Sequence, residues 1–421
     1  MRIVFSTFGT FGDVNPLIAL SLELKRRGHT PVLAVPEMFR AKIEPLGIPF
    51  HAVRPDQDPN DTRLVAMIYD IKKGTERGLR EFLFPVVRHS YEDLLAAVEA
   101  DGGADLLVTG ELAYAGPIVA EKTGIPWASY VLAPFSFFSG YDPPVLPPYP
   151  TLARVQAMVP GMGHGVARFA RFVTRTWPEP IYALRQELGL GRGRDPIFDA
   201  KHSEHLVLAL FSKVLAAPQL DWPTRTLITG FSFYDGDAGK TELTPELERF
   251  LAAGPPPLVF TLGSAAVMHA GDFYEQSARA AEMLGQRAVL LVGTDERNLP
   301  KHPVPDSICV TPWAPYSALF PRASAIIHQG GVGTTAQALR AGRPMLVMPY
   351  SHDQPDNARR VRRLGVARVL QRKAYNARSA ARIIEEMLST SSCAENAAAV
   401  ARSMLEEDGV RAACDALEAI R

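Results

Sequence analysis

The stretch from Ser324 to Ala341 reads SAIIHQGGVGTTAQALRA and places a glycine-rich loop between an apolar run and a helix-forming segment. The run 325–327 predicts a buried strand, and residues 336–341 predict a helix. Glycines permit a tight turn and a close approach of the backbone to a ligand. Free N–H groups at a helix start attract phosphate oxygens. The stretch therefore predicts a strand–loop–helix unit whose loop binds an anion.

The anion-binding groups of this unit are expected in the loop and at its entrance. His328 ends the predicted strand, and Gly330, Gly331, Gly333 and Thr334 follow it. The imidazole and the hydroxyl can add hydrogen bonds to phosphate oxygens. No Lys follows the glycines, so the loop is not a Walker A motif. A structural turn with a satisfied histidine is the alternative interpretation.

The same alternation of short apolar runs and longer helical segments extends outward along both halves of the chain. Continuous apolar strands that alternate with helices indicate parallel sheets covered on both faces. The sequence therefore predicts an α/β protein with two doubly wound, Rossmann-like domains. The predicted strands are 3–7, 31–35, 105–109 and 127–132 in the first half, and 257–262, 288–292, 307–311, 324–328 and 345–348 in the second.

The domain boundaries follow from the stretches that lack this alternation. We expect an N-terminal domain over residues 1–215 and a linker over 216–240, which is rich in Pro, Gly and Asp. A second domain is expected over 241–392, and the Ala-rich helices of 393–421 are expected to pack back on the first domain. Ligands of open parallel sheets bind outside the carboxyl ends of the strands. We therefore expect the two domains to face a cleft.

Composition excludes several classes of protein. The 421 residues fit two domains, and equal numbers of basic and acidic residues, 45 of each, argue against nucleic acid as a partner. Three widely spaced cysteines make neither a disulfide framework nor a metal-ligand pattern, which indicates a reducing compartment. No apolar stretch reaches the ~18 residues that span a bilayer, and the N-terminus lacks the regions of a signal peptide. We expect a soluble cytoplasmic protein without an integral membrane segment; its oligomeric state stays open.

One local basic cluster interrupts the even charge distribution. It consists of Arg359, Arg360, Arg362 and Arg363 in a predicted helix. A solvated helix face is the interpretation that we favour for all four arginines.

A second loop with chemical potential follows the first strand. It contains Gly9, Gly12 and Asp13, and Pro16 follows. Asp13 could serve only as the helix N-cap, with Pro16 in the first turn. At the end of a strand, however, its carboxylate can also point into the cleft and act as a base.

Two further strand ends carry polar or aromatic side chains. Asp353 and Gln354 follow the predicted strand 345–348, where they could grip adjacent sugar hydroxyls or only cap the next helix. Trp313 follows the strand 307–311, where it could stack on a nucleobase or lie in the core. Each of these signals is weak alone.

Taken together, these loops resemble the metal-independent glycosyltransferases of the GT-B fold, and glycosyltransferase family 1 in particular. The resemblance covers nearly the whole chain and is strongest from Trp313 to Gln354. There, Trp-Ala-Pro is followed fifteen residues later by His-x-Gly and then by Asp-Gln, as in the nucleotide-sugar donor site of that family.

The resemblance implies a role for each matching residue. Trp313 would stack on the base, while the backbone of Ala314 would hydrogen-bond it. Asp353 and Gln354 would hold the sugar hydroxyls. The diphosphate would lie against His328, Gly330, Gly331, Gly333 and Thr334, and a further donor loop would comprise Thr261, Gly263 and Ser264.

Departures from the family pattern leave the donor open. Asp13 stands where plant and many microbial members carry His; its Gly-Asp-Val-x-Pro context is similar to the bacterial antibiotic and sterol glycosyltransferases, which are taken to use this Asp as base. Tyr316 and Ala336 replace the Gln and the ribose-binding Glu of plant members, and Gln337 is a candidate substitute for that Glu. UDP-glucose is the preferred donor. The alternative is dTDP-rhamnose, transferred to a lipid or natural product.

The resemblance also implies an inverting transfer of a hexose to an acceptor hydroxyl, without a metal or a cofactor. The amides of the loop 330–336 would stabilise the departing diphosphate. Asp13 would take the acceptor proton, and burial would bring its pKa closer to that task. Glu111, after the strand 105–109, is a candidate helper.

The acceptor is expected over the first domain. The irregular stretch 133–150 contains six prolines and is too long and too aromatic for a simple connection. An aromatic lining suggests a hydrophobic small molecule such as a polyphenol, macrolide, sterol or lipid; core filling is the alternative. The expected lining residues are Phe11, Phe135, Phe137, Phe138 and Tyr141, with Trp177 as a further candidate.

Two other functions compete with transfer. A nucleotide-sugar 2-epimerase would bind UDP without needing an acceptor pocket. A non-catalytic relic would hold nucleotide and transfer nothing.

Overall fold

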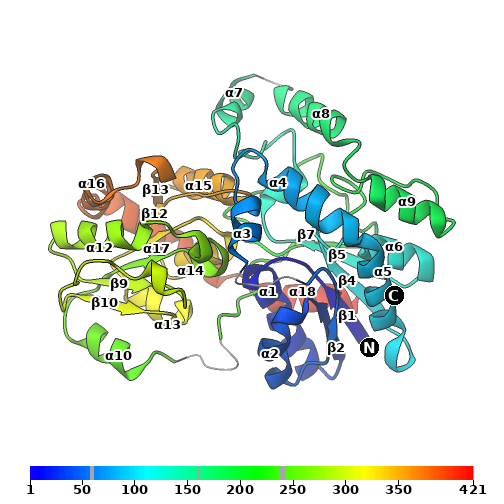
Figure 1. Cartoon of the computed structure of the whole chain (residues 1–421), viewed down its shortest axis with the longest axis horizontal. Coiled ribbons are helices and arrows are strands. Elements are labelled where there is room, and N and C mark those ends of the chain that lie inside the picture. The colour runs from blue at the N-terminus through cyan, green and yellow to red at the C-terminus, as the bar shows by residue number, and fades with distance from the viewer. Residues whose placement is uncertain (57–60, 160, 237–241, 421) are drawn as a thin grey trace. The chain divides into compact units, whose positions relative to one another are not determined.

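The computed structural model describes residues 1–56, 61–159, 161–236 and 242–420, which form two compact units. The first unit is Met1–Tyr234 together with Glu407–Arg421, and the second is Asp235–Glu406. Each unit contains one parallel sheet with helices against it (Figure 1). The prediction of two Rossmann-like α/β domains is therefore confirmed.

The first sheet has seven strands in the order β3-β2-β1-β4-β5-β6-β7. The order reverses between β1 and β4, which is the switch point at which open parallel sheets bind ligands. The strands are β1 (Arg2–Ser6), β2 (Thr30–Val35), β3 (Phe50–Ala52), β4 (Leu106–Gly110), β5 (Trp127–Val131), β6 (Val207–Ala209) and β7 (Thr226–Ile228).

The second sheet has six strands in the order β10-β9-β8-β11-β12-β13. Its switch point lies between β8 and β11, the strand that leads into the glycine-rich loop. The strands are β8 (Leu258–Thr261), β9 (Ala288–Leu291), β10 (Ile308–Thr311), β11 (Ala325–His328), β12 (Met345–Val347) and β13 (Ala367–Val369).

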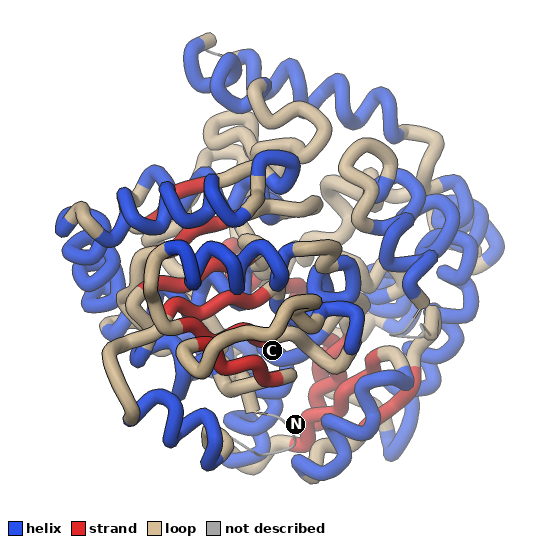
Figure 2. The backbone as a smooth tube through the Cα atoms, turned by 60° about the vertical axis from the view of Figure 1, so that its left-hand side comes forward, coloured by secondary structure: helices blue, strands red, loops and turns tan. Residues whose placement is uncertain are grey.

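Helices surround the strands in both units (Figure 2). The helices of the first unit are α1 (Phe11–Arg26), α2 (Arg40–Ile43), α3 (Thr62–Ile68), α4 (Gly74–Arg77), α5 (Val87–Glu99), α6 (Gly116–Thr123), α7 (Leu152–Met158), α8 (Met162–Thr174), α9 (Glu179–Glu187) and α18 (Gly409–Glu418). Those of the second are α10 (Pro245–Ala252), α11 (Gly263–Ala266), α12 (Phe273–Met283), α13 (Tyr316–Leu319), α14 (Val332–Arg340), α15 (Gln354–Arg363), α16 (Ala377–Leu388) and α17 (Ser391–Leu405).

Successive side chains of the strands supply two separate cores. Ile3 and Phe5 of β1 pack with Leu417 of α18 in one apolar cluster. Val4, which points to the opposite face, packs with Leu94 of α5 in another. This alternation explains why β1 reads as a continuous apolar run: both faces of the first sheet are covered.

The structure corrects the predicted linker and C-terminal tail. β7 lies inside the predicted linker 216–240 and pairs in parallel with β6, so this part of the chain belongs to the first sheet. Strands of three residues, such as β6 and β7, are too short to give a periodic signal. In the tail, α17 packs on α14 within the second unit, and only α18 packs on α1 of the first.

The basic cluster of α15 is also corrected. Arg362 and Arg363 are exposed, as expected of a solvated face, but Arg360 is 1% exposed. Its Nε lies 2.6 Å from Oδ2 of the equally buried Asp356. One turn of helix separates the two residues, so their side chains meet on the inner face. The pair is part of the core of the second unit.

Replacing Arg360 by Met is expected to lower the free energy of unfolding by about 3–5 kcal/mol, because the buried Asp356 carboxylate loses its closer cationic partner and keeps only Arg359, 3.5 Å away. Chemical denaturation measures the change. Arg362→Met, on the exposed side of the same helix, is the matched control and should shift stability by less than about 0.5 kcal/mol. Equal stability of the two variants would contradict the assignment of Arg360 to the core.

Two observations bear on the expected location. In the part of the chain that the structure describes, no helix is both long and apolar enough to cross a membrane. Cys309, Cys393 and Cys414 are all free thiols.

Candidate functional site

His328 is the central side chain at the switch point of the second unit. It ends β11 and is fully buried, and burial lowers its pKa to about 3. The backbone N–H of Gly330 donates to its Nδ1 over 3.1 Å. A neutral imidazole whose Nδ1 accepts must carry its proton on Nε2. That Nε2–H has no partner within the described residues. The ring therefore has a buried hydrogen-bond donor that a ligand could use.

Other polar atoms without partners gather around the same loop. Gln329 Oε1, Thr335 Oγ1 and Asn357 Oδ1 are buried and make no hydrogen bond to the described residues. The amide of Asn357 donates to the carbonyl of Gly330 over 3.0 Å, which fixes the loop against the start of α15. Buried polar groups are normally paired. A cluster that is not fully paired indicates a place where a polar ligand completes the hydrogen bonds.

The glycines of the loop differ in what surrounds them. Gly330 has φ +88°, and an added Cβ would lie 2.8 Å from Val347 Cγ1, so this position requires glycine. Gly331 is the N-cap of α14, and no side chain caps the helix. An added Cβ at Gly333 would meet nothing within 4 Å. The first turn of α14 therefore presents uncapped N–H groups beside open space, as an anion requires.

Thr261 and Tyr316 stiffen the neighbouring loop. The Thr261 hydroxyl lies 2.9 Å from the Tyr316 hydroxyl and also accepts from the N–H of Gly263 over 3.2 Å. The Tyr316 ring stacks on Phe320 with centroids 4.3 Å apart. Thr261 is thus occupied in holding the turn, whereas Ser264, three residues on, is exposed.

Asp353 and Gln354 lie at the start of α15, next to the glycine-rich loop. Asp353 is the N-cap position but makes no side-chain cap; Asn357 instead donates to its Oδ2 over 2.7 Å. Oε1 of Gln354 accepts from the N–H of Tyr350 over 2.9 Å. Pro355 is the second helical residue rather than the first. Both side chains are positioned by the protein before any ligand is present.

Trp313 and Ala314 occupy the loop after β10. Trp313 is 41% exposed, which is unusual for so large an apolar side chain, whereas Ala314 is buried. The ring is therefore available as a stacking surface, and core filling does not account for it.

Asp13 at the switch point of the first unit belongs to a capping box. The sequence-based alternative, with Asp13 as N-cap and Pro16 in the first turn, is wrong: Thr10 is the N-cap, and Pro16 lies inside α1. The Thr10 hydroxyl accepts from the N–H of Gly12, while Asp13 Oδ2 accepts from the N–H of Thr10 over 2.7 Å. The helix therefore starts about one turn earlier than predicted, because the side chains of Thr10 and Asp13 accept hydrogen bonds from backbone N–H groups that have no partner inside the helix.

Asp13 is half-buried, and the charge of a second carboxylate acts on it. Burial raises its pKa to about 6; the hydrogen bonds from Thr10 oppose this shift, and the negative charge of Glu111 adds to it. Both carboxylates also act on Tyr130, whose pKa burial raises well above its ordinary value, so that the phenol stays neutral. An acid that titrates near neutrality is suited to accept a proton from a hydroxyl.

Glu111 is held by two side chains from distant parts of the chain. The Ser136 hydroxyl donates to its Oε1 over 2.6 Å, and the ammonium of Lys201 lies 3.1 Å from its Oε2. Lys201 is largely buried, with 12% of its side chain exposed. The ammonium offsets the charge that Glu111 would otherwise add near Asp13.

The aromatic residues predicted to line an acceptor site divide into three groups. Phe137 is buried and stacks on Trp222 with centroids 4.2 Å apart, and Phe11 packs edge-on against Phe39 over 5.3 Å; packing accounts for both rings. Phe135 and Phe138 are half-buried. The remaining candidates are Tyr141, which is 54% exposed, and Trp177, which packs against the apolar cluster that contains Leu94 of α5.

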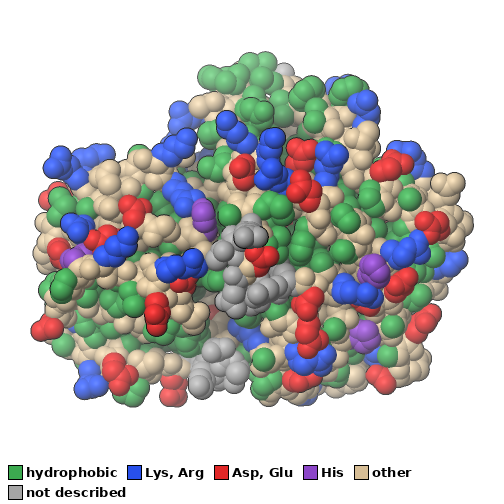
Figure 3. Space-filling view, viewed as in Figure 1, with side chains coloured by type: hydrophobic (Ala, Val, Ile, Leu, Met, Phe, Trp, Pro, Cys, Tyr) green, Lys and Arg blue, Asp and Glu red, His purple; other side chains and the backbone are tan. Residues whose placement is uncertain are grey.

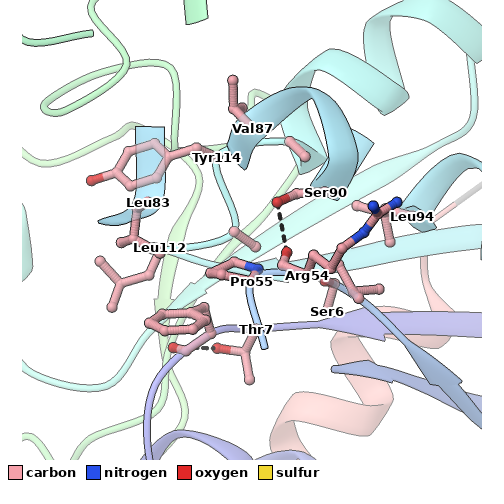
Figure 4. A pocket seen from close by; sticks show the side chains of 14 residues that line it. Ser6, Thr7, Arg54, Pro55, Leu83, Val87, Ser90, Leu94, Leu112 and Tyr114 are labelled. Carbon is pink, nitrogen blue, oxygen red and sulfur yellow. Dashed lines mark hydrogen bonds between the residues drawn. The ribbon is translucent and has the colours of Figure 1, made fainter. Parts of the chain in front are cut away.

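A narrow pocket opens at the carboxyl ends of β1 and β4 (Figure 4). Its walls are mainly apolar. Thr7 lines the pocket and shortly precedes the loop of Asp13 in the sequence. The Ser90 hydroxyl donates to the Arg54 carbonyl over 2.6 Å and joins α5 to the pocket rim. The lining comprises Ser6, Thr7, Phe8, Val53, Arg54, Pro55, Leu83, Val87, Ser90, Leu94, Leu112, Ala113, Tyr114 and Ala115.

Comparison with known proteins identifies the family of this chain. Residues 3–136 match the N-terminal domain of glycosyltransferase family 28, and residues 281–419 match the C-terminal domain described as erythromycin biosynthesis protein CIII-like. The O-mycaminosyltylonolide 6-deoxyallosyltransferase of Streptomyces fradiae is 32% identical over 99% of this chain and 97% of its own length. The chain belongs to these glycosyltransferases.

Other relatives of this glycosyltransferase agree with the assignment. The vancomycin aglycone glucosyltransferase of Amycolatopsis orientalis is 29% identical over 87% of this chain and 85% of its own. A spinosyn rhamnosyltransferase, solved with thymidine diphosphate, has the same fold with a TM-score of 0.71, at 18% identity over 99% of this chain and 100% of its own. The glycosyltransferase is therefore an enzyme with the GT-B fold. The narrower assignment to glycosyltransferase family 1 stays a prediction.

Sequence reasoning missed several residues of the two candidate sites of the glycosyltransferase. Asn357 and Gln329 were not singled out, nor were Ser136 and Lys201. Asn357 follows Asp353 by four residues, so a shared helix face was a usable signal. Lys201 and Ser136 are 90 and 25 residues from Glu111, and only the fold brings them together.

Proposed function

We propose that this glycosyltransferase transfers a hexose from a nucleoside diphosphate sugar to a hydroxyl of a hydrophobic natural product, with inversion at the anomeric carbon. The observation that carries the proposal is the buried Nε2–H of His328, which has no partner among the described residues and belongs to the strand that leads into the uncapped first turn of α14. A leaving diphosphate gains negative charge in the transition state, and both features are suited to stabilise it.

The remaining donor contacts follow from the second unit. Trp313 would stack on the base beside the Ala314 backbone, and Gly330, Gly331, Gly333 and Thr334 would hold the diphosphate. Asp353 and Gln354 would hold the sugar, while Gly263 and Ser264 would approach the phosphates. Thr261 would act through the loop that it fixes.

Asp13 would act as the general base. Its carboxylate would remove the acceptor proton as the acceptor oxygen attacks the anomeric carbon on the face opposite the diphosphate, which gives inversion. A pKa of about 6 leaves the carboxylate ionised at neutral pH while keeping it a better base than an ordinary Asp. Phe135, Phe138 and Tyr141, together with the apolar pocket beside Thr7, would receive the acceptor.

The donor that we place first is a thymidine-linked deoxyhexose, with UDP-glucose second. The residue at 336, where plant members use Glu to hold both ribose hydroxyls, is a buried Ala, so no carboxylate there selects for the 2′-hydroxyl. The relatives' names point the same way: one transfers a 6-deoxyallosyl group, and another is a rhamnosyltransferase bound to thymidine diphosphate.

A donor panel tests the proposal. dTDP-rhamnose, dTDP-glucose, UDP-glucose and UDP-galactose are each incubated with a pool of macrolide and phenolic acceptors, and nucleotide release is measured. The glycoside from the active pair is examined by NMR for its anomeric configuration. Retention of configuration would overturn the inverting mechanism. Release of ManNAc from UDP-GlcNAc without acceptor would indicate an epimerase, and thermal protection by nucleotide without turnover a relic.

Chelation tests whether turnover requires a divalent metal ion. We propose that no divalent cation is needed, because helix N–H groups and His328 supply the positive potential. Asp-x-Asp triplets do occur at 56–58 and 235–237, and each extends into residues outside the described part of the chain. EDTA should leave turnover unchanged; its loss, with recovery on adding Mg²⁺ or Mn²⁺, would contradict the proposal.

Replacing Gly333 by Ala is expected to weaken donor binding without weakening the fold. The added methyl meets no protein atom within 4 Å and favours helix, so Tm should stay equal or rise. The same methyl would occupy the space proposed for the diphosphate, so KM for the donor should rise by roughly tenfold or more. Gly165→Ala, also helical with open space around it, is the control. An unchanged donor KM would place the diphosphate elsewhere.

Replacing Lys201 by Met is expected to shift the acid limb of kcat/KM to higher pH. In the wild type, activity should fall as pH decreases through about 6, where Asp13 becomes protonated. Without the ammonium, Glu111 bears more strongly on Asp13 and favours the protonated form. Glu111→Gln should move the acid limb to lower pH. Lys201→Arg keeps the positive charge, so its acid limb should stay at the wild-type position. If the acid limbs of the wild type and the three variants coincide, Lys201 has only a structural role.

A further inference from the structure

In helix α8 of the first unit, the aromatic residues face solvent and not the protein. Gly163 faces inward, where an added Cβ would lie 2.2 Å from the carbonyl of Gly140 and 2.8 Å from Pro143. Ala167 lines a small pocket beside the same loop. Gly163, Val166 and Ala167 thus lie on the side of α8 that contacts the protein, and Gly163 allows the close approach to the 138–146 loop.

The large apolar residues of α8 consequently point to solvent. Phe169 is 67% exposed, Phe172 is 61% exposed and Val173 is 48% exposed. They lie one turn or one residue apart and share one face of the helix. A surface helix normally turns its aromatic residues inward, so this outward face needs an explanation other than folding.

The adjacent helix α7 extends the same kind of surface. α7 and α8 contact each other and lie at the same edge of the first unit (Figure 1). Figure 3 shows hydrophobic side chains gathered over this edge. We call the exposed apolar residues of both helices and their connection the α7–α8 face: Val155, Met158, Val159, Phe169, Phe172 and Val173.

Positive charge accompanies the α7–α8 face. Between Asp142 and Glu179 the chain has four arginines and neither Asp nor Glu. Arg168, next to Phe169, has no acidic partner among the described residues, and the Arg175 guanidinium lies 4.1 Å from the Phe172 ring centroid. Arg171 is the exception, since it pairs with Asp199 over 2.5 Å. The face is therefore apolar with a basic margin.

We propose that the α7–α8 face docks on an anionic lipid surface. Helices that lie in a membrane interface combine exposed aromatic and aliphatic residues with Arg or Lys at the margin. A second copy of this chain is a poor occupant, because two such faces in contact would bring arginines against arginines. The charged residues between Asp142 and Glu179 are all arginines, so the margin carries one sign of charge, as docking on an anionic surface requires. The inference does not depend on the donor or acceptor chemistry above.

Docking would have a consequence for the enzyme. A hydrophobic acceptor concentrates in lipid, so an enzyme attached to the same surface would meet it at higher local concentration. The attachment would be reversible, since a short interfacial helix buries little apolar area.

Vesicle co-sedimentation of the full chain tests the proposal. The wild type should sediment with mixed phosphatidylcholine–phosphatidylglycerol vesicles and at least tenfold less with phosphatidylcholine alone, with added salt weakening the anionic case. Phe169→Ser with Phe172→Ser should abolish sedimentation. Arg168→Gln with Arg175→Gln should weaken it by roughly tenfold or more. These side chains are exposed, so folding should survive, and Tm is measured for each variant.

Matched controls lie elsewhere on the surface. Met283→Ser with Leu405→Ser removes two apolar side chains that are 59% and 76% exposed, and Arg249→Gln with Arg411→Gln removes two exposed charges. Neither control should change sedimentation. Three outcomes overturn the proposal: no binding to anionic vesicles, equal loss in the controls, or a wild-type oligomer that only the Phe variant dissociates. A rise in acceptor KM in the Phe variant without vesicles would likewise overturn it and assign the face to acceptor binding.

Discussion

Replacing Asp13 by Asn is expected to lower kcat by roughly 10²- to 10⁴-fold while KM for the donor stays within about twofold. The Asn amide oxygen can still accept from the N–H of Thr10, so the capping box of α1 survives. What the variant loses is the ability to take a proton. Steady-state kinetics with the donor varied at saturating acceptor measure both constants.

Stability distinguishes the base from the cap. The Asp13 pKa is higher in the folded protein, about 6, than its ordinary value of 3.8. The stability from the protonated form is therefore present below pH 3.8 and is lost as pH rises through about 6. Asp13→Asn should accordingly match the wild type at about pH 3 and be the more stable at about pH 8.

Two capping variants complete the comparison. Asp13→Ala should also lose about 0.5–2 kcal/mol through the broken capping box. Thr10→Ala breaks the same box but keeps the carboxylate, so its kcat should stay well above that of Asp13→Asn. Equal turnover in these two variants would reduce Asp13 to a capping residue.

Replacing His328 by Ala is expected to weaken donor binding by about 10- to 150-fold, the usual value of a hydrogen bond to a charged group. The variant removes the buried Nε2–H, which has no partner among the described residues. Calorimetric titration with the nucleoside diphosphate alone measures the loss without any acceptor. His328→Gln places an amide N–H near the position of Nε2 and should recover part of the affinity.

The pH dependence of His328 gives an independent check. Burial lowers its pKa to about 3, so the ring is neutral throughout the working range. Donor affinity should therefore show no step near pH 6.5, where an ordinary histidine titrates. A step there that disappears in His328→Ala would mean that the ring binds phosphate as a cation, and the neutral-donor assignment would fail.

Local sequence signals were sufficient for the motifs that lie within one strand–loop–helix unit. His328, Gly330 and Gly333 fall in the stretch from Ser324 to Ala341, whose strand, turn and helix all follow from periodicity and glycine chemistry. Asp13 was also found this way, although its role in the helix start was misassigned by one turn. Short edge strands such as β7 and β13 escaped, because three residues carry no period.

Long-range contacts could not be found in the same way. The outward face of α8 depends on Gly163 fitting against Gly140, a contact that no hydrophobic pattern encodes. Arg360 looked like its exposed neighbours, and only packing made it a buried partner of Asp356.

The sequence by itself determined the fold class, the alternation of the longer strands with helices, and the loops that carry the candidate chemistry, because these depend on residues within a few turns of each other. The tertiary structure decided which groups work together. Lys201 meets Glu111 across 90 residues, and the imidazole of His328 is buried and neutral, with no partner for Nε2 in the described part of the chain. Distances and burial between remote segments set charge and protonation, and neither can be read from neighbours along the chain.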